Sequence, residues 1–180
     1  KFSVNNYFVA LEQDVGICSV TQMAERLGLK LANGKSIVET YHSIAAFTLG
    51  TAEIAPISMA NAYATLAARG LRCDPIILKS ARGKDGKEYE VPSANCQQVI
   101  PQEVADTVND ILRGPFQGGT ASSASIPGYN IAGKTGTDTG APTIWTVGYT
   151  PQLAGAAMIT VDKQADRYKH VNPERRSLVG

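Results

Sequence analysis

Hydrophobic residues recur at helical spacing in two stretches of the chain. Both stretches begin at a proline, Pro56 and Pro101, and a proline suits the first turn of a helix because its missing N–H has no partner there. Both end at a glycine, Gly70 and Gly114, the residue type most often found just past a helix. The apolar stripes consist of Met59, Tyr63 and Leu66 in the first stretch and of Val104, Val108, Ile111 and Leu112 in the second. The pattern predicts an amphipathic helix in each stretch.

Two more helices are expected near the start of the chain. One begins within residues 6–11. The other is opened by Ser19 and Gln22, which have the spacing of a capping box, and is ended by Gly28. Residues 30–51 show little periodicity and therefore predict a long ordered loop. Loops of that length in a compact domain tend to be functional.

The later part of the chain predicts strands. Strand-like runs cover 76–81, 87–91, 129–137, 143–149 and 153–161. Gly83–Gly86 joins the first two as a hairpin, since Asp-Gly tolerates positive φ, and Thr150–Gln152 turns the last two against each other. Helices followed by an antiparallel meander predict an α+β fold with an antiparallel sheet flanked by helices. The apolar pattern ends after Asp162, so we expect one domain over 1–162 and an irregular tail over 163–180.

Composition narrows the class of protein. Hydrophobic residues make up 43% and charged residues 18% of the chain, which is typical of globular rather than disordered proteins. The formal net charge of +1 argues against a dedicated nucleic-acid binder, which would carry a basic patch. No apolar run reaches the roughly 18 residues that a membrane-spanning helix needs. His42 and His170 stand in no recognisable motif, so we expect both to be structural or surface residues and expect no metal site.

Two of the three cysteines flank the predicted hairpin. Cys73 and Cys96 could therefore be brought together, and a bond between them would stabilise the fold by roughly 3 kcal/mol in the chain-entropy model. Such a disulfide would imply an oxidising compartment outside the cytoplasm, whereas two unlinked thiols would not. Both readings stay open at this point. Cys18 is expected to be a small buried apolar residue.

One motif points to nucleotide binding. Residues 128–135 match the phosphate-binding pattern G-x-x-x-x-G-K-[ST] letter for letter. That site needs a buried strand before the first glycine and a helix that begins at the lysine, whose N–H groups hold the phosphate. Small polar residues precede Gly128, and Gly136, Gly140 and Pro142 follow the lysine. The surroundings therefore disfavour a nucleotide site, which we keep as the alternative from another class.

Two short motifs point instead to serine acyl transfer. The chain has Ser-x-Asn at Ser3 and Asn5, and it has Lys-Thr-Gly at 134–136. These are two of the three motifs of enzymes whose active-site serine reacts with penicillin-like substrates. The third, Ser-x-x-Lys, is missing, because no serine here has a lysine three residues later. We therefore expect the attacking serine to lie upstream of Lys1.

The residue types suit distinct tasks in such a site. Lys134 can hold a substrate carboxylate and keep a neighbouring hydroxyl acidic, and the Ser3 hydroxyl can relay a proton towards a leaving group. Asn5 can orient a peptide carbonyl through its amide. Gly136 lets a ligand backbone approach the strand, so that the ligand can pair as an added strand. Thr137 can bind a terminal carboxylate through its hydroxyl and an oxyanion through its backbone N–H.

Strand geometry limits how these side chains can cooperate. Side chains alternate along a strand, so Lys134 and Gly136 face one way and Thr135 and Thr137 the other. Lys134 and Thr137 could then reach one ligand only through a twist or a bulge, which the sequence does not reveal.

Several segments resemble the transpeptidase domains of penicillin-binding proteins. They lie in the family's order and are 51–67, 118–121, 132–137 and 145–153. The first and last resemble the class A, bifunctional members more than class B, and the cysteine pair resembles actinobacterial versions. The resemblance implies the β-lactamase/transpeptidase-like fold, with an antiparallel sheet between helices beside a helical subdomain.

The same resemblance implies a function. The implied function is that of a peptidoglycan D,D-transpeptidase. In such an enzyme the upstream serine attacks the D-Ala-D-Ala bond of a stem peptide, and β-lactams trap the acyl-enzyme. Carried over by motif, Ser3 and Lys134 are catalytic residues, and Asn5 and 135–137 bind substrate. The implied partners are peptidoglycan stem peptides, β-lactam antibiotics and the upstream Ser-x-x-Lys segment of the same protein, without nucleic acid.

The resemblance also bears on cofactors, location and alternatives. It implies no metal or organic cofactor, and it places the membrane-anchored parent protein on the extracytoplasmic face of the bacterial cell membrane. A β-lactam-binding sensor or an inactive relative of the same fold is the nearest alternative. A serine β-lactamase is a weaker one, because the class A resemblance favours synthesis over hydrolysis.

Overall fold

The computed structural model describes residues 1–138 and 143–160. The tail expected over 163–180, which includes His170, lies outside this range, so the domain boundary at residue 162 stays a prediction. Among the described residues, no helix combines the length and the apolar character needed to cross a membrane.

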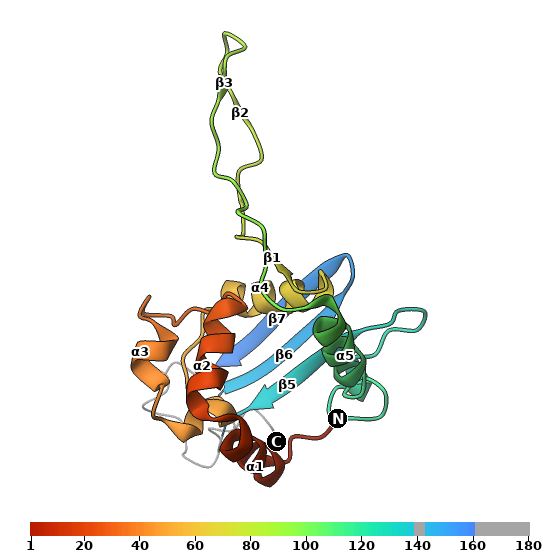
Figure 1. The fold of residues 1–180 in the computed structure, drawn as a ribbon. Coiled ribbons are helices and arrows are strands. Elements are labelled where there is room, and N and C mark those ends of the chain that lie inside the picture. Colours follow the sequence, from red (N-terminus) through yellow and green to blue (C-terminus); the bar gives the residue numbers. More distant parts are fainter. Residues whose placement is uncertain (139–142, 161–180) are drawn as a thin grey trace, which may run out of the picture.

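A three-stranded antiparallel sheet forms one layer of the molecule (Figure 1). Its strands lie in the order β5 (Ala132–Thr137), β6 (Thr143–Thr150) and β7 (Leu153–Thr160). The meander expected from the sequence is confirmed, although β5 begins three residues later than predicted. Thr150 pairs with Leu153, so Pro151 and Gln152 alone form the turn between β6 and β7.

Helices cover one face of this sheet. Helix α4 (Pro56–Ala67) contacts β6 and β7, while α5 (Gln102–Arg113) contacts β5. Four helices near the start of the chain form a separate group beside the sheet: α1 (Asn5–Val15), α2 (Ile17–Arg26), α3 (Ile37–Tyr41) and the 3₁₀-helix η1 (Ala45–Leu49). The predicted α+β class and the implied helical subdomain are therefore both present.

The main hydrophobic core lies between the sheet and the two covering helices. Its buried members are Leu66, Ile100, Ala105, Ala132 and Tyr149. The Tyr149 hydroxyl donates to Asn109 Oδ1 at 2.6 Å, and Asn109 Nδ2 donates to the Leu66 carbonyl at 2.9 Å. Burial raises the pKa of Tyr149, so its hydroxyl keeps the proton that it donates. This pair of bonds connects β6, α5 and the last turn of α4.

The two helices with a clear apolar stripe start and stop largely as predicted. Pro56 occupies the first turn of α4, Pro101 directly precedes α5, and Gly114 caps α5. The end of α4 differs from the prediction, because Ala68 is its cap. Gly70 lies two residues further on, where its N–H donates to the Thr65 carbonyl at 2.8 Å.

The capping box predicted at Ser19 is wrong. Helix α2 already begins at Ile17, after Gly16 with φ 83°, so Ser19 lies within the first turn and caps nothing. The prediction that Cys18 is buried is also wrong, since α2 turns Thr21 and Ala24 inward and leaves Cys18 exposed.

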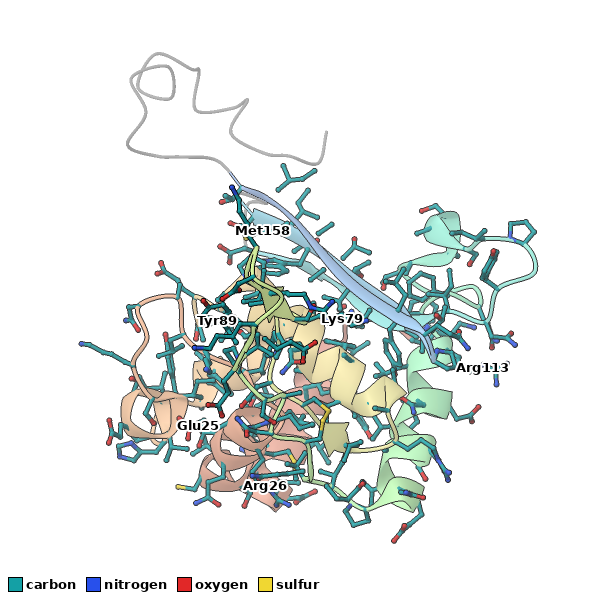
Figure 2. All side chains as sticks on the ribbon, turned by 90° about the horizontal axis from the view of Figure 1, so that it is seen from above. Glu25, Arg26, Lys79, Tyr89, Arg113 and Met158 are labelled. Atoms are coloured by element: carbon teal, nitrogen blue, oxygen red, sulfur yellow. A yellow bond between two sulfur atoms is a disulfide. The ribbon has the colours of Figure 1, made fainter. Side chains whose placement is uncertain are left out.

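The long loop predicted over 30–51 is wrong in part, since α3 and η1 interrupt it. Ser36 caps α3 by accepting a hydrogen bond from the Glu39 N–H at 3.1 Å. The Ser36 hydroxyl in turn donates to Glu25 Oε1 at 2.6 Å. Glu25 lies on α2 and is labelled in Figure 2. The Ser36 hydroxyl, followed by the Val38 N–H, holds the pKa of Glu25 below its usual range and connects α2 to α3.

Residues 73–96, here called the arm, project away from the body of the molecule (Figure 1). At its root, β1 (Leu71–Arg72) pairs with β4 (Gln97–Gln98), and a disulfide joins Cys73 to Cys96. At its tip, β2 (Ala81–Arg82) pairs with β3 (Glu88–Tyr89). The predicted hairpin turn is present, but β2 keeps only the last residue of the strand expected over 76–81, and β3 keeps two residues of the one expected over 87–91. Pro75 and Pro92 lie between the two short ladders, where a proline has no N–H to donate to a partner strand.

We expect trypsin to cut the arm before it cuts the body. The arm is exposed, and its tip carries the lysines and the arginine that trypsin requires (Lys79, Arg82, Lys84 and Lys87). Gel electrophoresis should show one band without reductant and two with it, because the Cys73–Cys96 bond closes the cut loop. A Cys96→Ser variant should give two bands in both cases. Two bands from the wild type without reductant would contradict the disulfide.

Strands β5 and β6 approach each other closely at Gly133, and the stability of the sheet depends on this contact. A Cβ at this position would meet the Val147 carbonyl oxygen and would lie 2.9 Å from the Gly148 Cα. We expect Gly133→Ala to lower the free energy of unfolding by about 2 kcal/mol, a typical cost of overpacking. Unfolding by denaturant measures this change in the free energy of unfolding. Gly155→Ala is the matched control in β7, where an added Cβ meets nothing within 4 Å. Equal effects of the two substitutions would contradict the close approach.

Candidate active site

Two residues that are far apart in the sequence meet in the structure. Lys134 Nζ, from the middle of β5, donates to the hydroxyl of Ser3, which stands just before α1, at 2.5 Å. The same ammonium donates to the Thr135 carbonyl at 2.8 Å. The structure thus brings together the side chains that the sequence predicted to be catalytic.

Lys134 is a partly buried cation. Desolvation by the surrounding protein lowers its pKa below the usual lysine value. None of the ion pairs formed within residues 1–138 and 143–160 involves it. Its charge is therefore not neutralised by a carboxylate of the described chain, which leaves it able to attract the carboxylate of a ligand.

Strand β5 is regular along its whole length. Every residue from Ala132 to Thr137 pairs in turn with β6, so no bulge changes the alternation of side chains. Lys134 and Gly136 therefore face the helices, on the same side of the sheet as buried Val147 and Tyr149. The sequence predicts that a twist or a bulge is needed to bring the Thr137 side chain beside Lys134. The structure has no bulge in β5.

The other residues expected at the site are placed as follows. Asn5 is the first residue of α1 and is exposed. Gly136 is exposed on β5, an edge strand of the described sheet, and a Cβ there would meet only the Trp145 Cβ, at 3.6 Å. Thr137 is exposed at the end of β5. This edge therefore has room for the backbone of a ligand.

Thr135 makes a contact that sequence reasoning missed. Its hydroxyl donates to the Thr120 hydroxyl at 2.8 Å, on the face of β5 opposite to Lys134. Thr120 belongs to the segment 118–121, one of those that carry the family resemblance. That resemblance was the only signal that could have pointed to it.

The nucleotide-binding alternative is wrong. Lys134 lies in the middle of a strand, so no helix N-terminus is present to hold a phosphate. The segment before Gly128 is a short 3₁₀-helix at Ser122–Ala124 and not a buried strand. The described residues also contain no group of three or more histidine, cysteine or acidic side chains that could hold a metal ion.

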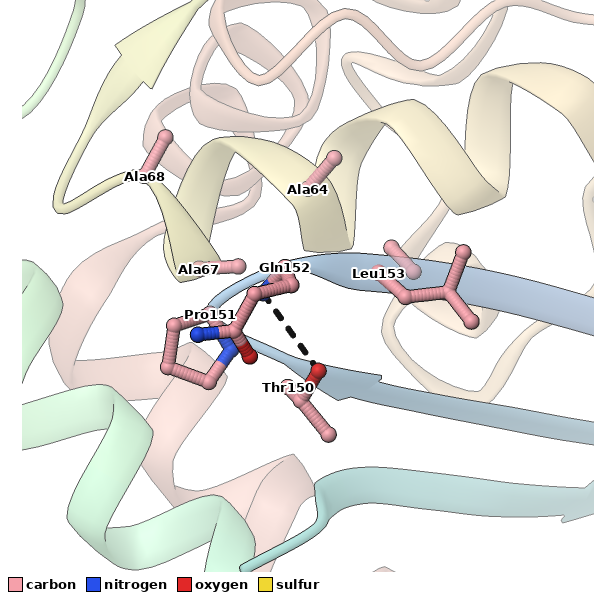
Figure 3. Close-up of a pocket in the computed structure, with 8 residues that line it drawn as sticks. Ala64, Ala67, Ala68, Thr150, Pro151, Gln152 and Leu153 are labelled. Atoms are coloured by element: carbon pink, nitrogen blue, oxygen red, sulfur yellow. Dashed lines mark hydrogen bonds between the residues drawn. The ribbon is translucent and has the colours of Figure 1, made fainter.

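A small hollow lies away from these residues, between the end of α4 and the turn from β6 to β7 (Figure 3). Its lining consists of Ala64, Ala67, Ala68, Thr150, Pro151, Gln152, Leu153 and Ala154. None of these side chains titrates near neutral pH or can act as a general base, so the hollow has no chemistry of its own.

Comparisons with known proteins agree with this geometry. The family model "Penicillin binding protein transpeptidase domain" matches residues 1–175. Penicillin-binding protein 1A of Aquifex aeolicus is 30% identical over 176 residues, which are 98% of this chain and 23% of the relative. The relative from Clostridium novyi, with the same name, is 32% identical over 88% of this chain and 18% of its own length. This chain thus spans about a fifth of these curated relatives.

Solved structures give the same result. The penicillin-binding protein PonA1 of Mycobacterium tuberculosis superposes with a TM-score of 0.75 and 27% identity, over 89% of this chain and 46% of that chain. A structure of PonA1 in complex with penicillin V has a TM-score of 0.69 and 28% identity, over 85% and 44% of the two chains.

The lowered pKa of Lys134 predicts a pH dependence of stability. Below the folded-state pKa the ammonium is charged in both states, and the folded state bears the full cost of burying it. As pH rises from that lowered pKa towards 10.5, the unfolded state holds a proton that the folded state has released, so stability rises. The free energy of unfolding of the wild type should therefore increase relative to Lys134→Met across this window.

Denaturant titrations over a pH series measure this difference. Lys35→Met, at an exposed lysine, is the matched control for the loss of a charge. A difference between wild type and Lys134→Met that stays constant or falls across the window would contradict the desolvation of Lys134.

Proposed function

Because the chain belongs to the penicillin-binding protein transpeptidase domain family, we propose that it supplies half of a serine acyl-transfer site that cross-links peptidoglycan stem peptides. The single observation that carries the proposal is the 2.5 Å hydrogen bond between Lys134 Nζ and Ser3 Oγ. It joins the Ser-x-Asn and Lys-Thr-Gly motifs across 131 residues of sequence. The attacking serine belongs to a Ser-x-x-Lys segment outside this chain.

The first half-reaction is acylation. The upstream serine oxygen attacks the carbonyl carbon of the penultimate D-alanine, and the C–N bond to the terminal D-alanine breaks. The attacking hydroxyl loses a proton and the leaving amine gains one, and the Ser3 hydroxyl is the group that passes the proton on to the amine. Lys134, whose pKa burial lowers, donates to that hydroxyl and so favours the transfer.

The second half-reaction transfers the acyl group. An amine of a neighbouring stem peptide attacks the ester carbonyl, a new amide bond forms and the ester C–O bond breaks. The proton that the amine loses returns to the serine oxygen through the same hydroxyl. The Lys134 charge attracts the substrate's terminal carboxylate in the first half-reaction. Asn5, Gly136 and Thr137 bind the peptide backbone along the edge of β5, where Gly136 leaves room for it. The Thr135 hydroxyl supports the strand from its other face.

A β-lactam acylates the same serine. Its strained amide takes the place of the D-Ala-D-Ala bond, but its leaving amine stays attached to the acyl group, so the acyl-enzyme persists. The penicillin V complex of PonA1 is a precedent in a relative. The Cys73–Cys96 disulfide supports an extracytoplasmic location for a membrane-anchored parent, since such bonds persist in oxidising compartments.

Labelling with a fluorescent penicillin tests the proposed roles in a chain that includes the upstream segment. Lys134→Ala and Ser3→Ala should each lower the second-order rate of labelling by roughly 100-fold, the size expected for loss of a proton-transfer group. Lys35→Ala is the control at an exposed lysine and should label like the wild type. Full labelling of Lys134→Ala would count heavily against the site.

Release of D-alanine separates a transpeptidase from a sensor. With a stem pentapeptide and an acceptor amine, the wild type should release D-alanine and form the cross-linked product, and Lys134→Ala should do neither at a measurable rate. A wild-type chain that is labelled by penicillin but releases no D-alanine would support the β-lactam-binding sensor and contradict the transpeptidase.

A further inference from the structure

Thr120 contacts both segments that carry the candidate catalytic residues. Its backbone N–H donates to the Lys1 carbonyl at 3.4 Å, two residues before Ser3. Its hydroxyl accepts from the Thr135 hydroxyl at 2.8 Å, one residue after Lys134. A single residue of the segment after α5 therefore bridges the start of the chain and β5.

The glycines before Thr120 leave room for the first residue of the chain. A Cβ on Gly119 would lie 2.6 Å from the Lys1 carbonyl oxygen and 2.7 Å from the Pro115 Cα, so only glycine lets these backbones approach. A Cβ on Gly114 would lie 3.6 Å from the Cβ of Lys1, and a Cβ on Gly118 would lie 3.7 Å from Lys1 Nζ. The start of the chain therefore lies directly against 114–120.

The segment after α5 is itself firmly held. The carbonyl of buried Pro115 accepts from the N–H groups of Gly119 and Ala121, at 3.1 and 3.0 Å. Phe116 lies against the position where Gly148 would carry a Cβ, on the face of the sheet away from the covering helices. The segment thus passes round the edge of β5, and Thr120 meets the sheet from the far face.

These contacts form a closed ring. It runs from Ser3 back to Lys1, across to Thr120, across to Thr135, along the strand to Lys134, and back to Ser3. The Lys134–Ser3 bond is the one that must change partners when a proton moves. The contact between Thr120 and Thr135 can stay in place during that step, because it lies on the face of β5 opposite to Lys134.

We infer that Thr120 is a positioning residue that holds Ser3 and Lys134 at their reacting distance while the bond between them changes. The inference rests on the proposed function. Thr120 acts through Thr135 and Lys1 and makes none of the contacts with Lys134 Nζ or Ser3 Oγ. Small displacements between reacting groups reduce rates strongly, so loss of the hydroxyl should appear in catalysis.

Variants at Thr120 and at Thr135 test the positioning role of the hydrogen bond between their hydroxyls. Thr120→Val removes the hydroxyl and leaves the backbone N–H that meets Lys1, and Thr120→Ser retains both. Thr135→Val removes the other hydroxyl. Thr107→Val is the matched control, since the Thr107 hydroxyl donates within α5, to the Glu103 carbonyl at 2.8 Å, and to no other group among the described residues. All are made in a chain that includes the upstream segment, and the rate of acylation by fluorescent penicillin is measured over pH.

The expected result has three parts. Thr120→Val and Thr135→Val each lower the acylation rate about fivefold, the order of one hydrogen bond, and shift the pH at which the rate is half-maximal. The double variant is no slower than either single one, because both remove the same contact. Thr120→Ser stays within about twofold of the wild type with an unshifted pH profile, and Thr107→Val behaves like the wild type.

Other outcomes overturn the inference. Normal acylation by Thr120→Val, additive losses in the double variant, or an unchanged pH profile together with a lowered melting temperature would each leave Thr120 without a positioning role. An unlabelled wild-type chain would instead overturn the proposed function and this inference with it. A labelled wild type with an unaffected Thr120→Val would overturn the inference alone.

Discussion

The candidate site depends on how closely β5 approaches β6 at Gly133. A side chain there would meet the Val147 carbonyl, so the two backbones come together only because position 133 carries none. The close approach holds the register of the sheet, and the register decides which face receives the ammonium of Lys134. A slip by one residue would turn that ammonium away from Ser3 and place the Thr135 hydroxyl there instead.

β5 serves two purposes through its two faces. The face towards the helices carries Lys134 and the chemistry, and the face away from them carries Thr135 and its support. The helices are held over the first face by the bonds from Tyr149 through Asn109 to the last turn of α4. The reacting groups therefore lie between layers whose spacing is set by buried contacts, while their own surroundings stay open to a ligand.

The sequence predicted what depends on local pattern. Prolines and glycines located α4 and α5 within a residue or two, and alternation located the meander, because these signals act within one turn or one strand. Ser19 and Ser36 show the limit, since each has a glutamine or glutamate three residues later, yet Ser19 lies inside α2 and Ser36 caps α3. The Ser3–Lys134 contact was expected because two short motifs occur together in one class of enzymes, since no local pattern encodes a contact across 131 residues. Thr120 was missed because no local pattern encodes its contacts with Lys1 and Thr135.

The root of the arm has a consequence for how this part of the chain can vary. The Cα atoms of Cys73 and Cys96 lie 4.1 Å apart, immediately beyond the short ladder that leads from α4 and into α5. The disulfide at that point fixes the distance between the two sides of the arm. The residues beyond it, towards the tip, are therefore not needed to fix that distance. Lengthening or shortening the tip costs little in loop entropy and leaves the helix layer over the sheet undisturbed. The arm can therefore accept insertions and deletions that the body could not.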